Sequence, residues 1–209
     1  MFSQLNHSEP EMRFLHVSWN DVQEMSEKLA EMVVESGFKP DVVVAVSRGG
    51  FAPARILCDL LDIKKLASVK VEYYTSVGVR GKEPVIVYPL NADVKNLRVL
   101  VVDDVADSGH SLLKAKTHVE EKGASEVRTA TLHYKPWSVI KPDYYVDETE
   151  DWVVYPWEVA ETVRDLYSKL KSEDLDREEI VERLVSYGFE RGFVEKILSA
   201  KLPQTPPSG

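Results

Sequence analysis

Apolar positions along the chain recur with two different periods, which predict helices and strands in alternation. Between Ser18 and Gly37 the apolar residues are spaced as on one face of a helix. The continuous apolar runs 42–46 and 99–102 are typical of strands buried on both faces. The remaining pattern predicts helices from Pro53 to about Leu61 and from Leu112 to Gly123, with strands at about 66–75, 85–88 and 127–133. We therefore expect an α/β fold with a parallel sheet flanked by helices.

The chain changes character at both ends of this alternating region. Residues 1–17 show only a weak secondary-structure pattern and are expected to form an N-terminal arm. Residues 18–171 contain the strands and helices of the expected main domain. Residues 172–202 show the spacing of short amphipathic helices interrupted at Gly188, and 203–209 are expected to be a disordered tail. Two short helices bury too little apolar surface to be stable alone, so this helical appendage must pack on the main domain or on a partner subunit.

Composition and charge narrow the classes of partner. A chain of 209 residues, 44% of them hydrophobic, suffices for one full core plus a small appendage. The net charge of −9 argues against a surface that wraps nucleic acid, and no apolar run approaches the ~18 residues of a membrane span. The start of the chain lacks the basic-then-apolar order of a signal peptide, and the single Cys58 suits a buried thiol in a reducing compartment. We expect a soluble cytoplasmic protein that binds neither nucleic acid nor membranes.

The strongest chemical signal follows the second buried strand, at the sheet edge where ligands of such folds bind. Two adjacent carboxylates, Asp103 and Asp104, come first, and a turn with Ser108, Gly109 and Ser111 opens the next helix. Backbone amides at a helix start, with two hydroxyls beside them, form a cradle for an anion, and a glycine lets the backbone approach a phosphate. The carboxylates would repel a phosphate, so accepting hydrogen bonds from vicinal ribose hydroxyls is their natural task. The cluster reads as a ribose 5-phosphate site.

The whole string Val99–Ser111 resembles the phosphoribosyl pyrophosphate signature of type I phosphoribosyltransferases. This resemblance implies the fold of that family and assigns phosphoribosyl binding to Asp103, Asp104, Ala106, Asp107, Ser108, Gly109, His110 and Ser111. It also makes Asp107 the general base near N7 of a purine. An Asp-Asp pair stands where many purine enzymes of the family have Glu-Asp, which keeps the chemistry.

A second segment, Val44–Gly50, resembles the family's pyrophosphate loop. The resemblance implies that Ser47, Arg48 and Gly49 bind pyrophosphate, that Arg48 assists catalysis, and that the Ser47–Arg48 peptide bond is cis. Taken alone, this segment would be interpreted as an ordinary strand-to-helix turn. Its presence in the same sequence as the first motif favours the pyrophosphate loop. The family reaction implies Mg²⁺ bound with phosphoribosyl pyrophosphate, because the cation neutralises the leaving oxygens. Asp103 and Asp104 are the expected metal contacts.

A third set of segments, within residues 131–158, looks like the small purine hood of the xanthine-guanine branch. By that resemblance Lys135 donates to an exocyclic oxygen of the base, Trp152 stacks on its ring, and the backbone of Val153 meets its edge. Glu158 is expected near the 2-position of the purine or near a metal-bound water. The other tryptophan of this region, Trp157, fits core packing better than base binding.

The segment between the strands at 66–75 and 85–88 holds glycines, a proline and basic residues, and it is expected to be a mobile loop over about 76–84. Ser76, Arg80 and Lys82 make this loop a candidate lid that excludes water during the reaction. The alternative to a lid is a connecting segment that has no role in the reaction.

The resemblance covers about residues 18–168 and implies a purine phosphoribosyltransferase of purine salvage. Its substrates would be phosphoribosyl pyrophosphate and a purine base, and the chain would form a homodimer. Lys135 suits the O6 of hypoxanthine, guanine or xanthine, but a flexible lysine and a hood reshaped by the appendage leave adenine as an alternative. The appendage is absent from the compact bacterial enzymes and present in archaeal relatives. A regulator on the same fold, which binds nucleotide without catalysis, is the alternative of another class.

Overall fold

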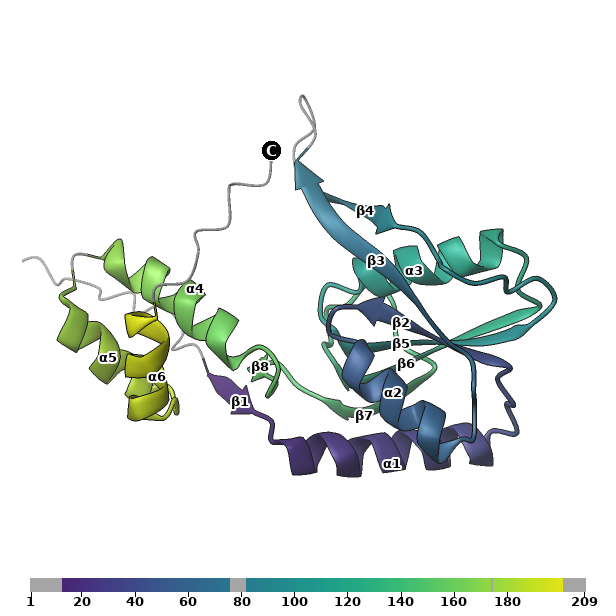
Figure 1. The fold of residues 1–209 in the computed structure, drawn as a ribbon, viewed down its shortest axis with the longest axis horizontal. Coiled ribbons are helices and arrows are strands. Elements are labelled where there is room, and N and C mark those ends of the chain that lie inside the picture. Colours follow the sequence, from purple (N-terminus) through teal and green to yellow (C-terminus); the bar gives the residue numbers. More distant parts are fainter. Residues whose placement is uncertain (1–12, 76–81, 174, 201–209) are drawn as a thin grey trace, which may run out of the picture. The chain divides into compact units, whose positions relative to one another are not determined.

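The computed structural model describes residues 13–75, 82–173 and 175–200 (Figure 1). The chain divides into two compact units. Trp19–Glu150 form the larger one, and the described parts of Met1–Ser18 and Asp151–Gly209 form the smaller one. Within the described residues, no helix combines the length and the apolar character needed to cross a membrane.

The larger unit is a six-stranded sheet with helices packed on it (Figure 1). Its strands are β2 (Val42–Ser47), β3 (Leu66–Thr75), β4 (Lys82–Tyr88), β5 (Arg98–Ala106), β6 (Glu126–Tyr134) and β7 (Tyr144–Glu148), and its helices are α1 (Trp19–Glu35), α2 (Phe51–Leu60) and α3 (His110–Glu121). The strand order is β4-β3-β2-β5-β6-β7, and every neighbouring pair is parallel except the antiparallel pair β3 and β4. The expected α/β fold with a mostly parallel sheet is confirmed.

Burial on both faces explains why the central strands consist almost wholly of valine, alanine and leucine. Alternate positions of β2 and β5, such as Val44 and Val101, share one apolar cluster with Leu112 and Val119 of α3. Helices α1 and α2 contact each other, and α2 also contacts β2 and β5. The parallel register places Ala45 opposite Val102, so the segments that follow β2 and β5 emerge at the same edge of the sheet. This edge carries the candidate site.

Two strands of this sheet are longer than the apolar pattern predicts. Strand β4 begins at Lys82 rather than at about 85, so residues 82–84 belong to a strand and not to the expected loop. Pro84 is compatible with this strand because β4 lies at the edge of the sheet order, where a missing backbone donor is tolerated. Strand β5 continues beyond the apolar run through Asp103 to Ala106, since these residues pair with β6.

The smaller unit combines the two ends of the chain. Its strands β1 (Phe14–His16) and β8 (Trp152–Val154) form a parallel pair, and its helices are α4 (Val159–Lys171), α5 (Arg177–Ser186) and α6 (Arg191–Ser199). Asp176 and Glu179 form a capping box that starts α5. The core joins β8 to all three helices, through Val154, Val163, Leu170, Ile180, Val181, Leu184, Phe189 and Val194. The expected arm therefore contributes a strand, while residues 1–12 and the expected tail 203–209 lie outside the described residues.

The segment expected to form one hood, residues 131–158, is divided between the two units. Thr131–Tyr134 continue strand β6, and residues 144–148 form β7, the last strand of the main sheet. Residues 152–154 form β8 of the smaller unit. The appendage expected over 172–202 supplies α5 and α6, which pack on α4.

Candidate active site

The turn between β5 and α3 has a backbone geometry that is compatible with the expected anion cradle. Gly109 caps α3 with a left-handed backbone, at a φ of 77°. A Cβ there would lie 2.1 Å from Oγ of Ser138, so glycine is required both for its conformation and for its lack of a side chain. Helix α3 begins at His110, whose Nδ1 donates to the carbonyl oxygen of Ser108 over 3.1 Å. The first backbone N–H groups of α3 have no partner within the helix, and they lie beside the hydroxyls of Ser108 and Ser111.

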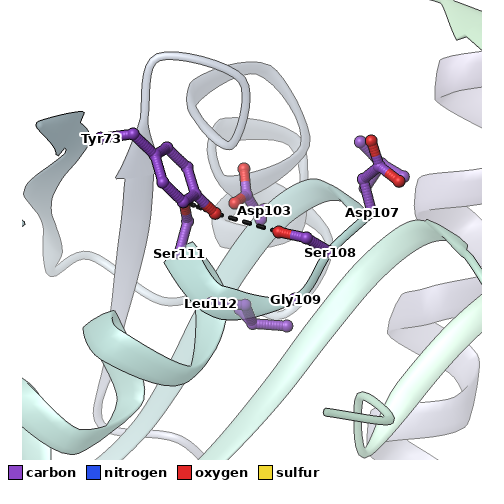
Figure 2. A pocket seen from close by; sticks show the side chains of 8 residues that line it. Tyr73, Asp103, Asp107, Ser108, Gly109, Ser111 and Leu112 are labelled. Carbon is purple, nitrogen blue, oxygen red and sulfur yellow. Dashed lines mark hydrogen bonds between the residues drawn. The ribbon is translucent and has the colours of Figure 1, made fainter. Parts of the chain in front are cut away.

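A pocket of about 230 Å³ opens beside this turn (Figure 2). Five of the residues assigned to phosphoribosyl binding line it, together with three others: Tyr73, Asp103, Val105, Asp107, Ser108, Gly109, Ser111 and Leu112. The carboxylate of Asp103 and the cradle thus share one cavity, as the reading of a ribose 5-phosphate site requires.

Tyr73 is a site residue that the sequence reasoning missed. It comes from β3, and its hydroxyl lies 3.0 Å from Oγ of Ser108 and 3.3 Å from Oγ of Ser111 (Figure 2). The hydroxyl of Tyr73 therefore links the two serine hydroxyls of the cradle, where an anion would meet them. The available signal was its place near the carboxyl end of a strand that neighbours β2.

Replacing Tyr73 by phenylalanine is expected to weaken the binding of ribose 5-phosphate about tenfold, because a hydrogen bond to a charged group contributes about 1.5–3 kcal/mol. Isothermal titration calorimetry measures the dissociation constant directly. The matched control is Tyr88→Phe, since Tyr88 is an exposed tyrosine on β4 that does not line the pocket. Equal affinities of wild type and Tyr73→Phe would exclude the Tyr73 hydroxyl as a phosphate contact.

Asp103 and Asp104 are adjacent on β5, and their carboxyl groups interact with each other. Asp103 lines the pocket, while the carboxylate of Asp104 covers Gly49 of the loop after β2. Both side chains are only 8% exposed. Burial, and then the neighbouring Asp104 carboxylate, raise the pKa of Asp103 well above its usual range. The pair therefore gives up its second proton less readily than two separate carboxyls, and it favours a partner that brings positive charge or hydroxyl donors.

The loop after β2 has the features implied by the resemblance. The Ser47–Arg48 peptide bond is cis. Oγ of Ser47 donates to the carbonyl oxygen of Val69 over 3.3 Å, and Arg48 is exposed. A Cβ on Gly49 would lie 2.0 Å from Oδ2 of Asp104, so the loop backbone passes directly over this carboxylate. The structure thus brings the expected pyrophosphate loop next to the acid pair.

Asp107 is held by Trp137, a second residue that the sequence reasoning missed. The indole Nε1 of Trp137 donates to Oδ1 of Asp107 over 3.1 Å. The ammonium of Lys135, a side chain only 4% exposed, lies 5.5 Å from the centroid of the same indole. The backbone N–H of Lys135 donates to the carbonyl oxygen of Ala106 over 3.1 Å, which ties this loop to the end of β5. The expected general base and the expected base-binding lysine are therefore neighbours.

The other expected base contacts belong to the smaller unit. Trp152 is 52% exposed on β8, as a stacking surface would be. The backbone N–H of Trp152 donates to the carbonyl oxygen of Arg13, and the carbonyl oxygen of Val154 accepts from the backbone N–H of Val17. The backbone hydrogen-bonding groups of Trp152 and Val154 therefore point toward β1. Because the strand alternates, Val153 between them turns its N–H and C=O away from β1. Glu158 accepts a hydrogen bond from the N–H of Tyr155 over 3.2 Å at the start of α4.

The expected lid is only partly within the described residues. Ser76 and Arg80 lie outside them, and Lys82 begins β4. Within the described ranges, no cluster of three or more His, Cys, Asp or Glu side chains is arranged to hold a metal ion.

His133, on β6 beside the site, gives the protein a predicted dependence of stability on pH. Burial lowers the pKa of this 2% exposed histidine from 6.5 to about 4, against an opposing effect of Asp147. Because the folded pKa is the lower one, its contribution is complete above pH 6.5 and is lost as the pH falls from there toward 4. Between pH 7.5 and pH 5 the free energy of unfolding is expected to fall by about 2 kcal/mol through this residue. Urea denaturation of wild type and His133→Gln at both pH values measures it, and an identical pH dependence in the two proteins would contradict it.

Comparisons with known proteins agree with this geometry. The model of the phosphoribosyl transferase domain matches residues 18–163. A xanthine-guanine phosphoribosyltransferase from Ruegeria sp. (strain TM1040) is 29% identical over 163 residues, which cover 72% of this chain and 89% of that protein. The crystal structure of a purine phosphoribosyltransferase from Pyrococcus horikoshii Ot3 has 41% identity and a TM-score of 0.63, over 70% of this chain and 94% of that one.

A third similarity concerns the fold alone. The xanthine-guanine-hypoxanthine phosphoribosyltransferase of Helicobacter pylori shares 23% identity, with a TM-score of 0.62 over 75% of this chain and 99% of that one. The family match covers most of the chain and contains the pyrophosphate loop, the acid pair and the phosphate cradle. This protein therefore belongs to the phosphoribosyltransferase family, with the type I fold that the signature at residues 99–111 indicates.

Proposed function

We propose that the protein is a purine phosphoribosyltransferase of purine salvage. It transfers the 5-phosphoribosyl group of phosphoribosyl pyrophosphate to a 6-oxopurine and gives the nucleoside 5′-monophosphate and pyrophosphate. The relatives named above include enzymes for xanthine and guanine and a purine phosphoribosyltransferase that is 41% identical. The regulator without catalysis is disfavoured because the signature is present in the sequence and five of the eight residues assigned to phosphoribosyl binding line one pocket.

The main support for the proposal is that Trp137 contacts both Asp107, by a hydrogen bond, and Lys135, by a cation–π contact. The carboxylate and the ammonium therefore lie on either side of one indole. In a 6-oxopurine, O6 and N7 share one edge of the ring. An ammonium donor matches O6, and a carboxylate matches a proton on the neighbouring nitrogen. Adenine presents an amino group in place of O6, and this group would face the buried Lys135 ammonium without an acceptor between them.

The phosphoribosyl group is proposed to bind along the pocket described above. The amides at the start of α3 and the hydroxyls of Ser108 and Ser111 take the 5-phosphate. Asp103, whose carboxylate opens into the same pocket, accepts hydrogen bonds from the ribose hydroxyls. Arg48 and the backbone of Gly49 bind the pyrophosphate.

Mg²⁺ fits this site because the acid pair offers hard oxygen ligands and gains from a positive partner. When bound, the cation neutralises charge on the pyrophosphate oxygens. Asp103 and Asp104 are the residues that would hold it. A contact with Glu158 through water, the weaker assignment, is part of the same proposal.

In the reaction the bond from C1 of the ribose to the pyrophosphate oxygen breaks, and a bond from C1 to a purine nitrogen forms. The electron pair leaves with pyrophosphate, whose charge Arg48 and the loop amides stabilise as preorganised donors. The proton of the purine passes to Asp107, whose Oδ1 is already held by Trp137 and whose other oxygen remains for the base. Trp152 stacks on the ring, and the backbone of Val153 meets its edge.

Initial rates with adenine, hypoxanthine, guanine and xanthine, each with phosphoribosyl pyrophosphate and Mg²⁺, test the proposal. Turnover of at least one 6-oxopurine is expected, with adenine slower by about 10²-fold or more because a buried donor would be left unpaired. Turnover of adenine alone would reverse the assignment of the base. An absence of turnover with all four bases would favour the regulator.

We also propose that the protein is a homodimer. Strand β4 ends the order of the main sheet, and it and its neighbour β3 carry exposed apolar side chains, among them Leu66, Val85 and Tyr88. Light scattering at micromolar concentration is expected to give twice the chain mass of 23.7 kDa. A single species of 23.7 kDa would contradict the dimer.

A further inference from the structure

Helices α5 and α6 lie beyond residue 163, where the family match ends, yet they share a core with the strand that carries Trp152. Val154 of β8 is 1% exposed and packs in one cluster with Ile180 and Leu184 of α5 and Val194 of α6. Strand β8 therefore rests on helices that the family region does not include.

The turn between α5 and α6 also holds β1, the strand paired with β8. Nε2 of His16 donates to the carbonyl oxygen of Tyr187 over 2.8 Å. The ring of His16 meets Phe189 edge-on with 4.9 Å between centroids, and the ring of Phe14 lies 5.0 Å from that of Tyr187. With a further ring contact between Phe14 and Phe189 at 5.9 Å, one hydrogen bond and three ring contacts fix β1 to this turn.

Gly188, at the centre of the turn, allows this close approach. Its φ is 94°, and a Cβ there would lie 2.9 Å from Nε2 of His16. A side chain at this position would therefore strain the turn and push directly against His16. The turn is built so that its backbone can reach the histidine.

Strand β1, held by the α5–α6 turn, in turn pairs with β8. The register pairs Phe14 with Trp152 and His16 with Val154. The N–H of Trp152 donates to the carbonyl oxygen of Arg13 over 2.8 Å, and the side chain of Arg13 forms an ion pair of 2.9 Å with Asp151. The position of Trp152 is thus set by β1, which the α5–α6 turn in turn holds.

We propose that the α5–α6 turn, Tyr187–Phe189, positions the base-binding strand β8 through His16 of β1, and that it thereby sets the affinity for the purine. The proposal rests on the proposed function, since it takes Trp152 and Val153 as contacts of the base. His16 is a positioning residue. Its main effect is expected on the base, because the residues proposed to bind phosphoribosyl pyrophosphate belong to the larger unit, apart from the weaker assignment of Glu158.

Three variants separate this role from general stability. His16→Phe keeps an aromatic ring beside Phe189 and loses the donor to Tyr187, whereas His16→Gln keeps a donor. Ser186→Ala is the matched control, because Ser186 ends α5 and its Oγ donates only to Arg183 of the same helix. The KM for the purine is expected to rise about fivefold in His16→Phe, as for the loss of one neutral hydrogen bond, and less in His16→Gln. Turnover and the KM for phosphoribosyl pyrophosphate are expected to stay within twofold in all three.

A second readout does not depend on activity. The indole N–H signal of Trp152 in an NMR spectrum, assigned with Trp152→Phe, is expected to shift or broaden in His16→Phe and in Gly188→Ala, while that of Trp137 stays in place. An unchanged purine KM or an unchanged Trp152 signal in a folded variant overturns the proposal. If His16→Phe does not fold, His16→Gln and Gly188→Ala decide by the same two measurements. If the wild type turns over no purine, the proposed function fails, and the Trp152 signal still decides whether the turn positions β8.

Discussion

Asp107→Asn is expected to lower the turnover number about 10²-fold or more, the usual size of a general-base effect, while the KM for phosphoribosyl pyrophosphate stays within a few-fold. The asparagine keeps an oxygen that can accept the hydrogen bond from Trp137, so the local arrangement has a reason to persist. What it loses is a group that takes up a proton from the purine. Steady-state kinetics with each substrate varied in turn separates turnover from binding.

The matched control for Asp107→Asn is Asp93→Asn, in the loop before β5. Oδ1 of Asp93 accepts the N–H of Lys95 over 3.0 Å, and an asparagine oxygen can accept it equally well. This control removes the same charge without touching the pocket, so its turnover is expected to be that of the wild type. A turnover number that is unchanged in Asp107→Asn would remove Asp107 from the chemistry.

The sheet and the phosphate cradle were predictable because both are encoded locally. The apolar run of β5 and the turn at Gly109 lie in one short stretch of sequence, in which the strand, the close approach and the helix start each need a particular residue type. The parallel register then brings the loop at Gly49 to the same edge without any further signal. Local pattern and topology therefore sufficed for most of the larger unit.

The contacts of Tyr73 and Trp137 were not predictable in the same way. Each depends on a side chain that reaches across from another element, Tyr73 from β3 and Trp137 from the loop after β6. A tyrosine or tryptophan near a strand end is equally compatible with an interface, and only the three-dimensional fold determines which atom it contacts. Trp137 lies two positions from Lys135, and this proximity was the one available signal.

The organisation of the smaller unit depends on pairing between the two ends of the chain. Phe14–His16 are too few to show a strand period, and they form β1 because β8 lies beside them. For the same reason the boundary expected at 171/172 does not separate the helices, since Leu170 of α4 packs in one core with Ile180 and Val194. Contacts between residues so far apart in the chain cannot be predicted from the local sequence pattern.

Gly49→Ala is expected to reduce kcat/KM for phosphoribosyl pyrophosphate about 10²-fold, comparable with the removal of one preorganised donor from an oxyanion site. The added Cβ would lie 2.0 Å from Oδ2, 2.4 Å from Cγ and 2.6 Å from Oδ1 of Asp104. This carboxylate is 8% exposed, and its Oδ1 accepts the N–H of Val105 over 2.8 Å, so it has little room to withdraw. Either the acid or the loop must move, and each displacement disturbs the site.

Gly192→Ala is the matched control for Gly49→Ala, because its nearest Cβ contact is the flexible end of Glu190, at 3.1 Å. Thermal denaturation shows whether each variant is folded. If the clash with the carboxylate is the cause, then Asp104→Ser should cost much less activity in the Gly49→Ala background than in the wild type, because the two residues are in contact and their effects cannot add. Strictly additive losses in the double variant would place the effect of Gly49→Ala in the loop alone, and normal kinetics in the single variant would show that the loop adapts without cost.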